Sequence, residues 1–183
     1  MIFARSTICS TIAAAALALM AGQALAAGPV VLTVTGAVEN TNRDAINPDF
    51  DKLFVFNDTS FDKAMEFDLE GLAALPQTTV RTDFPLGGDL VEYSGPALAE
   101  VLSAAGATGD TVTVQALDGY AVDVPYTEMI DKGAVLALSR DGTPLGIGSF
   151  GPAQIVFPRG EREDLAEMPD DWWVWQIYHI SVK

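Results

Sequence analysis

The sequence has very little of the chemistry on which most catalytic and metal-binding sites depend. Its 183 residues include one cysteine, Cys9, and one histidine, His179. Cys9 falls in an N-terminal segment that we expect to be removed, so the processed chain is predicted to hold no disulfide, thiolate metal ligand or cysteine nucleophile. A single histidine in a predicted strand favours a structural role and argues against a Ser-His-Asp triad or a multi-histidine metal site. We therefore predict no metal site.

Basic side chains are scarce as well. Ten Lys and Arg residues stand against 25 Asp and Glu residues, which gives a formal net charge of −15. Such a surface repels nucleic acid and anionic lipid, and it favours a cationic protein partner or simple solubility. The Gly-rich segment Gly146 to Pro152 lacks the Lys-Ser/Thr pair of a phosphate-binding loop, and a proline and a predicted strand follow it in place of a helix.

Long apolar runs are confined to the N-terminus. Arg5 precedes an apolar run from Ile12 to Met20, and Ala24-Leu25-Ala26 has the small-x-small pattern that a signal peptidase recognises. We predict a signal peptide at 1–26 and a single exported, periplasmic domain at 27–183. No other run is long enough to span a bilayer, so no membrane insertion is expected.

The stretch from Ser94 to Pro125 gives the clearest structural prediction. Ser94 suits a helix N-cap, Pro96 the first turn and Gly106 the left-handed position after the last turn. The apolar residues between them, at 98, 101, 102 and 105, form one helical stripe. Apolar residues then alternate with polar ones through 111–116, and Asp118-Gly119 predicts a hairpin turn into a second strand at 120–124.

The rest of the chain mixes strands with short helices. A helix is predicted from Leu69 to Leu75 with Asp68 as its cap, and another near 126–130. The Asn- and Asp-rich segment 39–51 fails the calcium-loop pattern, because Ala45 occupies the glycine position. The segment 159–171 is predicted to be a charged, solvated loop. Strands are expected at 30–35, 52–56, 65–67, 78–82, 90–93, 134–139, 153–157 and 172–182. Because strands and helices do not alternate regularly, we predict an α+β fold.

Three places put a carboxylate beside an aromatic ring: Asp83 with Phe84, Asp118 with Tyr120, and Asp171 with the two tryptophans that follow it. A flat heterocycle with an amidine-like edge requires this combination, in which the carboxylate accepts two N–H bonds and the ring stacks. Such neighbours also arise by chance in an acidic chain, and Trp173 and Trp175 equally fit the core of a last strand.

Five segments, taken in order, resemble the molybdopterin-binding domain of the sulfite oxidase family. They are LEGLAALPQTTVRT, LVEYSGPALAEVLSAAGATGDTVTVQALDGYAVDVPYTEM, LALSRDGTPL, GPAQIVFP and WVWQIYHISV, and they cover most of Leu69 to Val182. The resemblance implies the mixed-sheet sulfite-oxidase-type fold. In the enzymes of that family a cysteine binds molybdenum from the strand before the helix, and here Thr82 stands at or beside that position. An arginine that helps to hold the cofactor's phosphate is matched by Gln154.

These departures predict that the chain has no catalytic residues and no molybdenum cofactor. Small, exported, cysteine-free members of the family include periplasmic pterin-binding proteins, which report to the sensor domain of an inner-membrane signalling enzyme, typically one that handles cyclic di-GMP. The resemblance therefore implies a reduced pterin as ligand and such a sensor as partner. The positions that match the family's cofactor site are Thr82, Asp83, Phe84, Asp118, Tyr120, Ser149, Phe150, Gln154, Arg159 and Trp172.

Two other hypotheses remain open from the sequence. The first is a molybdenum-cofactor-dependent oxidoreductase domain with atypical ligation of the metal. The second is an interaction protein whose pocket has collapsed, with the side chains of Phe84 and Trp172 filling the space.

Overall fold

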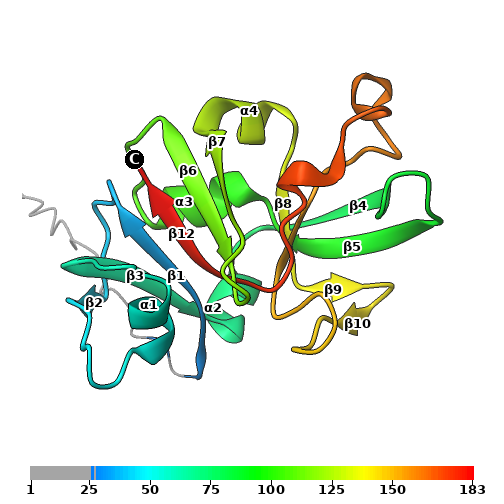
Figure 1. Ribbon diagram of the computed structural model, residues 1–183. Coiled ribbons are helices and arrows are strands. Elements are labelled where there is room, and N and C mark those ends of the chain that lie inside the picture. Colours follow the sequence, from blue (N-terminus) through cyan, green and yellow to red (C-terminus); the bar gives the residue numbers. More distant parts are fainter. Residues whose placement is uncertain (1–25, 27) are drawn as a thin grey trace, which may run out of the picture.

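A six-stranded mixed sheet forms one half of the computed structural model, which describes residues 26 and 28–183 (Figure 1). Only the central pair, β1 with β12, is parallel, and all other neighbours in this sheet are antiparallel. The expected signal peptide lies almost wholly outside the described residues. The strands run in the order β2 (Arg43–Asp44), β3 (Lys63–Asp68), β1 (Val30–Gly36), β12 (Ile177–Val182), β6 (Thr111–Ala116) and β7 (Ala121–Pro125).

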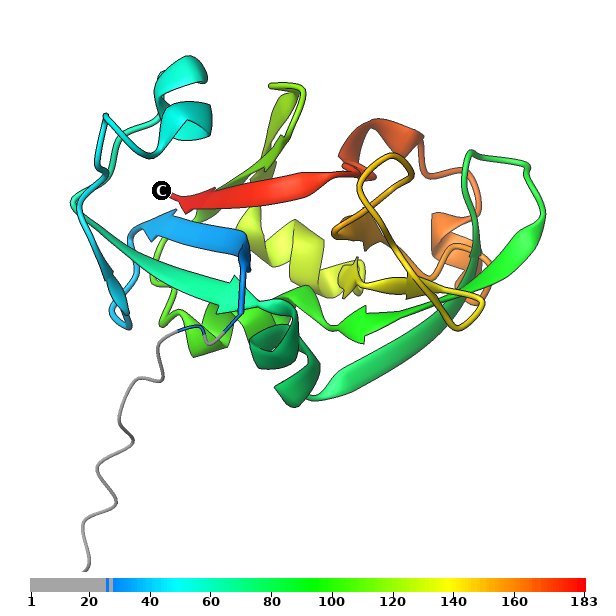
Figure 2. The same cartoon turned by 90° about the horizontal axis from the view of Figure 1, so that it is seen from below.

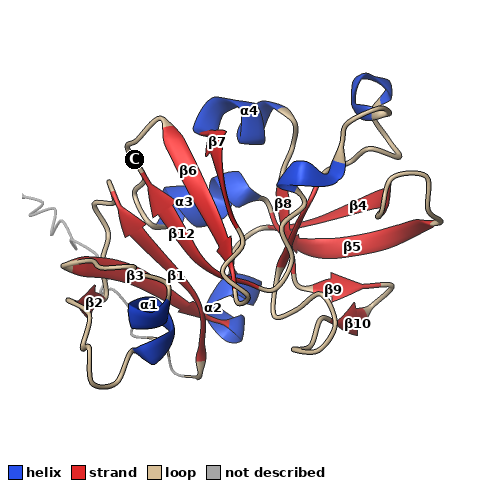
Figure 3. Ribbon diagram, viewed as in Figure 1, coloured by secondary structure: helices blue, strands red, loops and turns tan. Residues whose placement is uncertain are grey.

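Two smaller sheets form the other half, as the red arrows of Figure 3 show. A close backbone approach joins them. A Cβ added at Gly95 would lie 2.0 Å from the carbonyl oxygen of Leu136, so only glycine allows β5 to pack against β8 at this point. The four-stranded sheet is β10 (Thr143–Pro144), β9 (Ser139–Arg140), β5 (Leu90–Pro96) and β4 (Gln77–Asp83), and the two-stranded one is β11 (Gln154–Val156) with β8 (Val135–Ala137).

Short helices cover the six-stranded sheet. Figure 2 shows α1 on one side of it, with α2 and α3 on the other. Asp68 caps α2 as predicted, since its carboxylate accepts a hydrogen bond from the backbone N–H of Gly71 at 2.7 Å. The helices are α1 (Lys52–Phe56), α2 (Leu69–Ala74), α3 (Leu98–Ala104) and α4 (Tyr126–Asp131), with 3-10 turns η1 (Glu163–Leu165) and η2 (Asp170–Trp172). No helix of the described residues is long and apolar enough to cross a membrane.

The main core lies where α3 packs against strands of both halves of the structure. All four residues of the predicted helical stripe are fully buried there, and Gly106 after the helix has the predicted positive φ of 64°. Each large aliphatic side chain in this core contributes about 1.5–3 kcal/mol through its removal from water. The mixed α+β architecture predicted from the sequence is therefore confirmed, with Leu98, Val101, Leu102 and Ala105 packing against the strands.

The start of the predicted central helix is wrong. Ser94 and Pro96 belong to β5, where they pair with Thr79 and Gln77 of β4, and the helix begins at Leu98. The Ser94 hydroxyl is hydrogen-bonded with that of Thr79 at 2.9 Å and does not cap a helix. A long strand pairing satisfies more backbone groups than one cap, and sequence spacing alone does not reveal the partner strand.

Residues 52–56 form helix α1, so the predicted strand there is wrong. Phe54 packs edge-on against Phe61, in a small cluster with Tyr178 on the opposite side of the sheet from the main core. Arg43 holds the segment in place, because its guanidinium is paired with the carboxylates of both Asp51 and Glu66. These tertiary contacts override the strand propensity of the five residues.

The C-terminal region also differs from the prediction. The closing strand begins at Ile177, because η2 and a bend at Gln176, with φ of 55°, precede it. The segment 159–171 is not simply a solvated loop, since Arg159 and Leu165 within it are buried. The other predicted strands are present with bounds shifted by one to three residues, and the predicted strand 134–139 is divided between β8 and β9.

His179 is structural, as its isolation in the sequence suggested. It lies in β12, buried, with Nδ1 3.1 Å from Gln115 Oε1 and Nε2 2.8 Å from Thr35 Oγ1. The amide oxygen of Gln115 only accepts hydrogen bonds, so Nδ1 carries the proton and Nε2 accepts from the threonine hydroxyl. Burial lowers the pKa of His179 to about 4.

This burial predicts a loss of stability in acid. In the unfolded chain the histidine pKa is about 6.5, so the unfolded state binds more protons as the pH falls from there toward 4. We expect the free energy of unfolding to fall across this window by about 3 kcal/mol more in the wild type than in His179→Gln, which lacks the titrating ring. Urea unfolding of both proteins between pH 7 and pH 4 measures the difference. Parallel pH profiles would contradict the prediction, because the carboxylates contribute equally to both.

Candidate functional site

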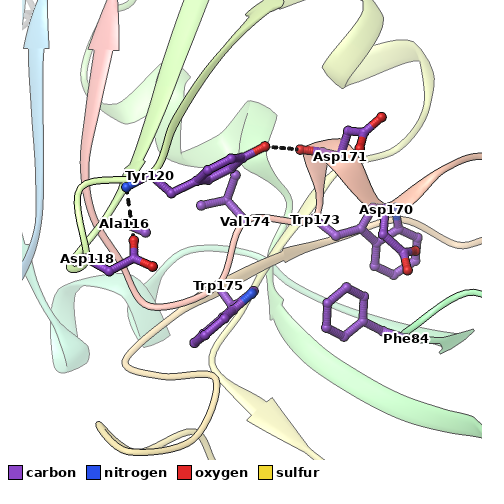
Figure 4. Close-up of a pocket in the computed structure, with 9 residues that line it drawn as sticks. All are labelled: Phe84, Ala116, Asp118, Tyr120, Asp170, Asp171, Trp173, Val174 and Trp175. Carbon is purple, nitrogen blue, oxygen red and sulfur yellow. Dashed lines mark hydrogen bonds between the residues drawn. The ribbon is translucent and has the colours of Figure 1, made fainter.

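The candidate site is a cavity of about 370 Å³ at the junction of the two halves (Figure 4). The turn between β6 and β7 forms one side of it, and the end of β4 with the segment around η2 forms the other. Because this space is open, Phe84 and Trp172 do not fill it, which argues against the collapsed-pocket hypothesis. The lining residues are Phe84, Ala116, Asp118, Tyr120, Asp170, Asp171, Trp173, Val174 and Trp175.

The predicted Asp118-Gly119 turn shapes one wall. The Asp118 carboxylate accepts a hydrogen bond from the backbone N–H of Tyr120 at 2.9 Å, and Gly119 has a φ of 92° that disfavours other residues. The turn directs the Tyr120 ring across the cavity, where its hydroxyl donates to the backbone carbonyl of Asp171 at 3.0 Å. One oxygen of Asp118 is engaged in this turn.

Aromatic rings form the opposite wall. Phe84 stacks on the buried ring of Trp173, with centroids 5.7 Å apart and planes 12° from parallel. Phe150 contacts Phe84 edge-on at 5.6 Å and Trp175 at 6.0 Å. Trp175 is 41% exposed, so it offers an aromatic surface that a flat ligand could cover.

Behind this wall, Arg159 is buried and directs most of its N–H groups to protein atoms. Its Nε donates to Asp83 Oδ1 at 2.6 Å and its Nη2 to the Asp83 carbonyl at 2.7 Å. Its Nη1 donates to Asp170 Oδ1 at 2.7 Å and to the Met168 carbonyl at 2.6 Å. The guanidinium carbon lies 4.3 Å from the centroid of the Trp173 ring. Four of five N–H donors are used, so Arg159 is a structural clamp.

The clamp favours the charged form of the Asp83 carboxylate. Partial burial of Asp83 opposes its ionisation, but hydrogen bonds from Arg159 and from the Gly87 N–H outweigh that cost and lower the Asp83 pKa below its usual range. Asp170 also accepts a hydrogen bond from the Leu86 N–H at 2.8 Å. Both carboxylates are therefore committed to the protein.

Asp118 is the carboxylate best placed to meet a ligand. Figure 4 shows it across the cavity from Phe84 and Trp173, whereas the carboxylate of Asp171 points away from the rings. Only one of the two Asp118 oxygens takes part in the turn hydrogen bond. The second oxygen is available to accept an N–H from a bound molecule.

The structure brings together only part of the site predicted from the sequence. Phe84, Asp118 and Tyr120 line the cavity. Phe150, Asp83 and Arg159 support its wall from behind.

The remaining predicted residues lie elsewhere. Trp172 lines a different cavity beside Lys132, and the Ser149 hydroxyl donates to the Gly146 carbonyl at 3.2 Å. Thr82 and Gln154 are fully buried and do not line the cavity, and their side-chain polar atoms have no hydrogen-bond partner.

The sequence did not indicate Trp175 or Asp170 as site residues, and it indicated Trp173 only as a neighbour of Asp171, with a core position as the alternative. The two tryptophans were assigned to a strand, in which they would share one face, but the irregular backbone here sends Trp173 into the core and leaves Trp175 half open. Their position two and four residues after Asp171 was the only local signal.

The residues present do not fit a molybdenum cofactor bound through a thiolate. Thr82, at the matching position, has a hydroxyl that is neither acidic nor soft enough to replace a cysteine sulfur. Arg159 has a single donor left for a phosphate group, since the other four bond Asp83, Met168 and Asp170. No step involving such a cofactor is derived from this site.

Comparison with known proteins gives evidence about the fold. No family model matches the chain, and no curated protein matches it. Among solved structures, the sulfane dehydrogenase SoxCD from Paracoccus pantotrophus is similar, with a TM-score of 0.55 and 19% sequence identity. The match covers 82% of this chain and 37% of that protein, so this chain spans well under half its length. At this identity the likeness establishes a related fold and carries no activity with it.

The Arg159 clamp predicts a large effect on stability. Arg159→Gln leaves Asp83 and Asp170 without their common partner, and we expect the free energy of unfolding to fall by about 3–5 kcal/mol. Chemical denaturation measures the loss. Arg162→Gln is the matched control, because Arg162 pairs with Asp164 at the surface, and a much smaller loss is expected there. Equal losses in the two variants would contradict the clamp.

Proposed function

We propose that this chain is a periplasmic, non-catalytic protein of the sulfite-oxidase-type fold that binds a reduced pterin and reports its presence to an inner-membrane sensor. The single observation that carries the proposal is the cavity in which Asp118 faces a group of aromatic rings. The fold shared with the sulfane dehydrogenase SoxCD and the motif resemblance both support the scaffold part of it.

The polar chemistry of the cavity matches one edge of a pterin. Apart from the Tyr120 hydroxyl, which already donates to Asp171, the side-chain polar groups of the lining residues are three carboxylates and the N–H groups of Trp173 and Trp175. Carboxylates only accept hydrogen bonds, so a ligand must present donors to them. The N3–H and 2-amino groups of a pterin are two adjacent donors, and its flat ring system suits stacking on Trp175.

Residue chemistry also supports a binding role over a catalytic one. His179 is held between Gln115 and Thr35 in the sheet and does not line the cavity. Thr82 has no base within hydrogen-bonding distance among the described residues that would activate its hydroxyl. The cavity therefore offers recognition groups without an activated nucleophile.

A loop beside the cavity suggests how occupancy reaches a partner. Gln176 ties the loop 146–151 to the aromatic wall, because its backbone N–H donates to the Phe150 carbonyl and its side chain to the Ser149 carbonyl, both at 2.9 Å. Ile147 in the same loop is 79% exposed. We propose that a ligand packed against Trp175 fixes the conformation of this loop. The periplasmic domain of a sensor of the cyclic di-GMP type then binds the apolar tip of the loop.

A molybdenum-cofactor oxidoreductase is the second candidate, and the fold similarity to a dehydrogenase is the observation that favours it. Metal analysis of protein purified from the periplasm separates the two. Molybdenum near one atom per chain would overturn the binding-protein proposal, whereas a compound that becomes fluorescent on oxidation would support it.

The pterin proposal predicts specific losses of affinity. Asp118→Asn removes the charged acceptor for the donor edge, and Trp175→Ala removes the stacking surface, so each is expected to weaken binding of tetrahydropterin by about tenfold or more. Fluorescence quenching titration under anaerobic conditions measures the affinity.

Matched controls are available on the same chain. Trp172→Ala removes a tryptophan from a separate cavity, and Asp62→Asn removes an exposed carboxylate, so neither should change the affinity. No binding of tetrahydropterin by the wild type, together with no shift in its melting temperature, would refute the proposal.

A further inference from the structure

One face of the four-stranded sheet carries polar groups that the proposed pterin site does not use. Cross-strand register places Tyr93 of β5 opposite Val80 of β4 and Arg140 of β9, and it places Thr82 opposite Val91. Directly paired residues project from the same face of a sheet. Thr82, Tyr93 and Arg140 therefore project from the same face, with Tyr93 on the middle one of the three strands.

Arg140 differs from the other well-packed arginines of this acidic protein. Arg43 pairs with two carboxylates, and so does Arg159. Arg140 is a partly buried residue whose guanidinium forms no ion pair with the described residues and contacts two rings. It lies 5.7 Å from the centroid of Tyr93 and 5.9 Å from that of Phe150.

Two buried hydroxyl groups on the same face also lack partners. Thr82 Oγ1 and the Tyr93 hydroxyl make no hydrogen bond, although both side chains are fully buried. An unpaired buried polar group destabilises the folded state, so two of them on one face call for an explanation. A bound group that accepts hydrogen bonds would satisfy both.

The ring contacts connect this face to the aromatic cavity. Phe150 touches Arg140 on one side and both Phe84 and Trp175 on the other. Phe84 follows Thr82 by two residues at the end of β4, so Phe150 and Phe84 lie between the cavity and the polar face. Phe150 belongs to the Gly-rich loop 146–151, whose glycines allow the ring to turn aside.

We infer that Arg140, Tyr93 and Thr82 form an oxyanion subsite next to the aromatic cavity. A carboxylate or phosphate group would pair with the Arg140 guanidinium and accept hydrogen bonds from the two hydroxyls. The group belongs either to a free small anion or to a substituent of the ligand whose ring occupies the cavity. The subsite itself does not depend on the pterin assignment.

Inorganic phosphate tests the subsite directly. Phosphate at millimolar concentration should raise the melting temperature of the wild type beyond the effect of sodium chloride at equal ionic strength. We expect Arg140→Gln to weaken the apparent phosphate affinity by about tenfold or more, and Tyr93→Phe to weaken it less. Arg81→Gln is the control, since it removes an equal charge from an exposed position on β4.

A comparison of two pterins identifies the source of the anion. This comparison rests on the proposed function, because it requires that the protein binds a pterin. If the anion is a substituent of the ligand, the wild type should bind pterin-6-carboxylate about tenfold more tightly than pterin. The Arg140→Gln variant should bind the two compounds with equal affinity. Equal affinities in the wild type, with a phosphate response, assign the subsite to a free anion.

The subsite is refuted if Arg140→Gln matches the wild type both in the rise of melting temperature with phosphate and in its affinity for pterin-6-carboxylate. If no pterin binds but the phosphate response still depends on Arg140, the pterin function fails and the subsite stands. Circular dichroism of each variant confirms that it is folded.

Discussion

The buried guanidinium of Arg159 is the interaction on which the candidate site depends. It joins the end of β4, through Asp83, to the segment before β12, through Met168 and Asp170. Arg159 is 76 residues from Asp83 in sequence, and the two segments that it joins carry Phe84 and Trp173. Because the guanidinium also packs on the Trp173 ring, one side chain sets both the charge balance and the position of the aromatic wall.

From this clamp, ring contacts extend outward in a defined order. Trp173 stacks on Phe84, and Phe84 contacts the ring of Phe150 edge-on. Phe150 in turn contacts the ring of Trp175 and the guanidinium of Arg140. Phe150 therefore stands between an acidic cavity and an unpaired cation. Ligand donors suit the first and an anion suits the second, so the two environments together favour a molecule with a donor edge and an anionic group, or two small ligands side by side.

The sequence predicted what is decided locally. The apolar stripe of α3, the Asp68 cap and the Asp118-Gly119 turn depend on residues within a few positions of one another, and all three are present. Ser94 was misassigned because its partner, Thr79, lies on another strand. The pairing of Arg159 with Asp83 was likewise invisible, so residues that support the wall were predicted to touch the ligand. Phe84 and Tyr120 were predicted because each follows a carboxylate closely.

Polar groups without partners are costly for a folded protein, and their distribution here is informative. The chain has 25 acidic residues and supplies two carboxylates each to Arg43 and Arg159, yet none pairs with Arg140. Thr82 and Tyr93, on the same face, leave two more groups unsatisfied. A ligand that pairs with these groups binds the folded state alone, so the cost is recovered as binding free energy and appears as stabilisation. The scaffold itself is held by contacts within the chain, the Arg159 clamp and the core, so the groups that face a ligand can differ without loss of the fold.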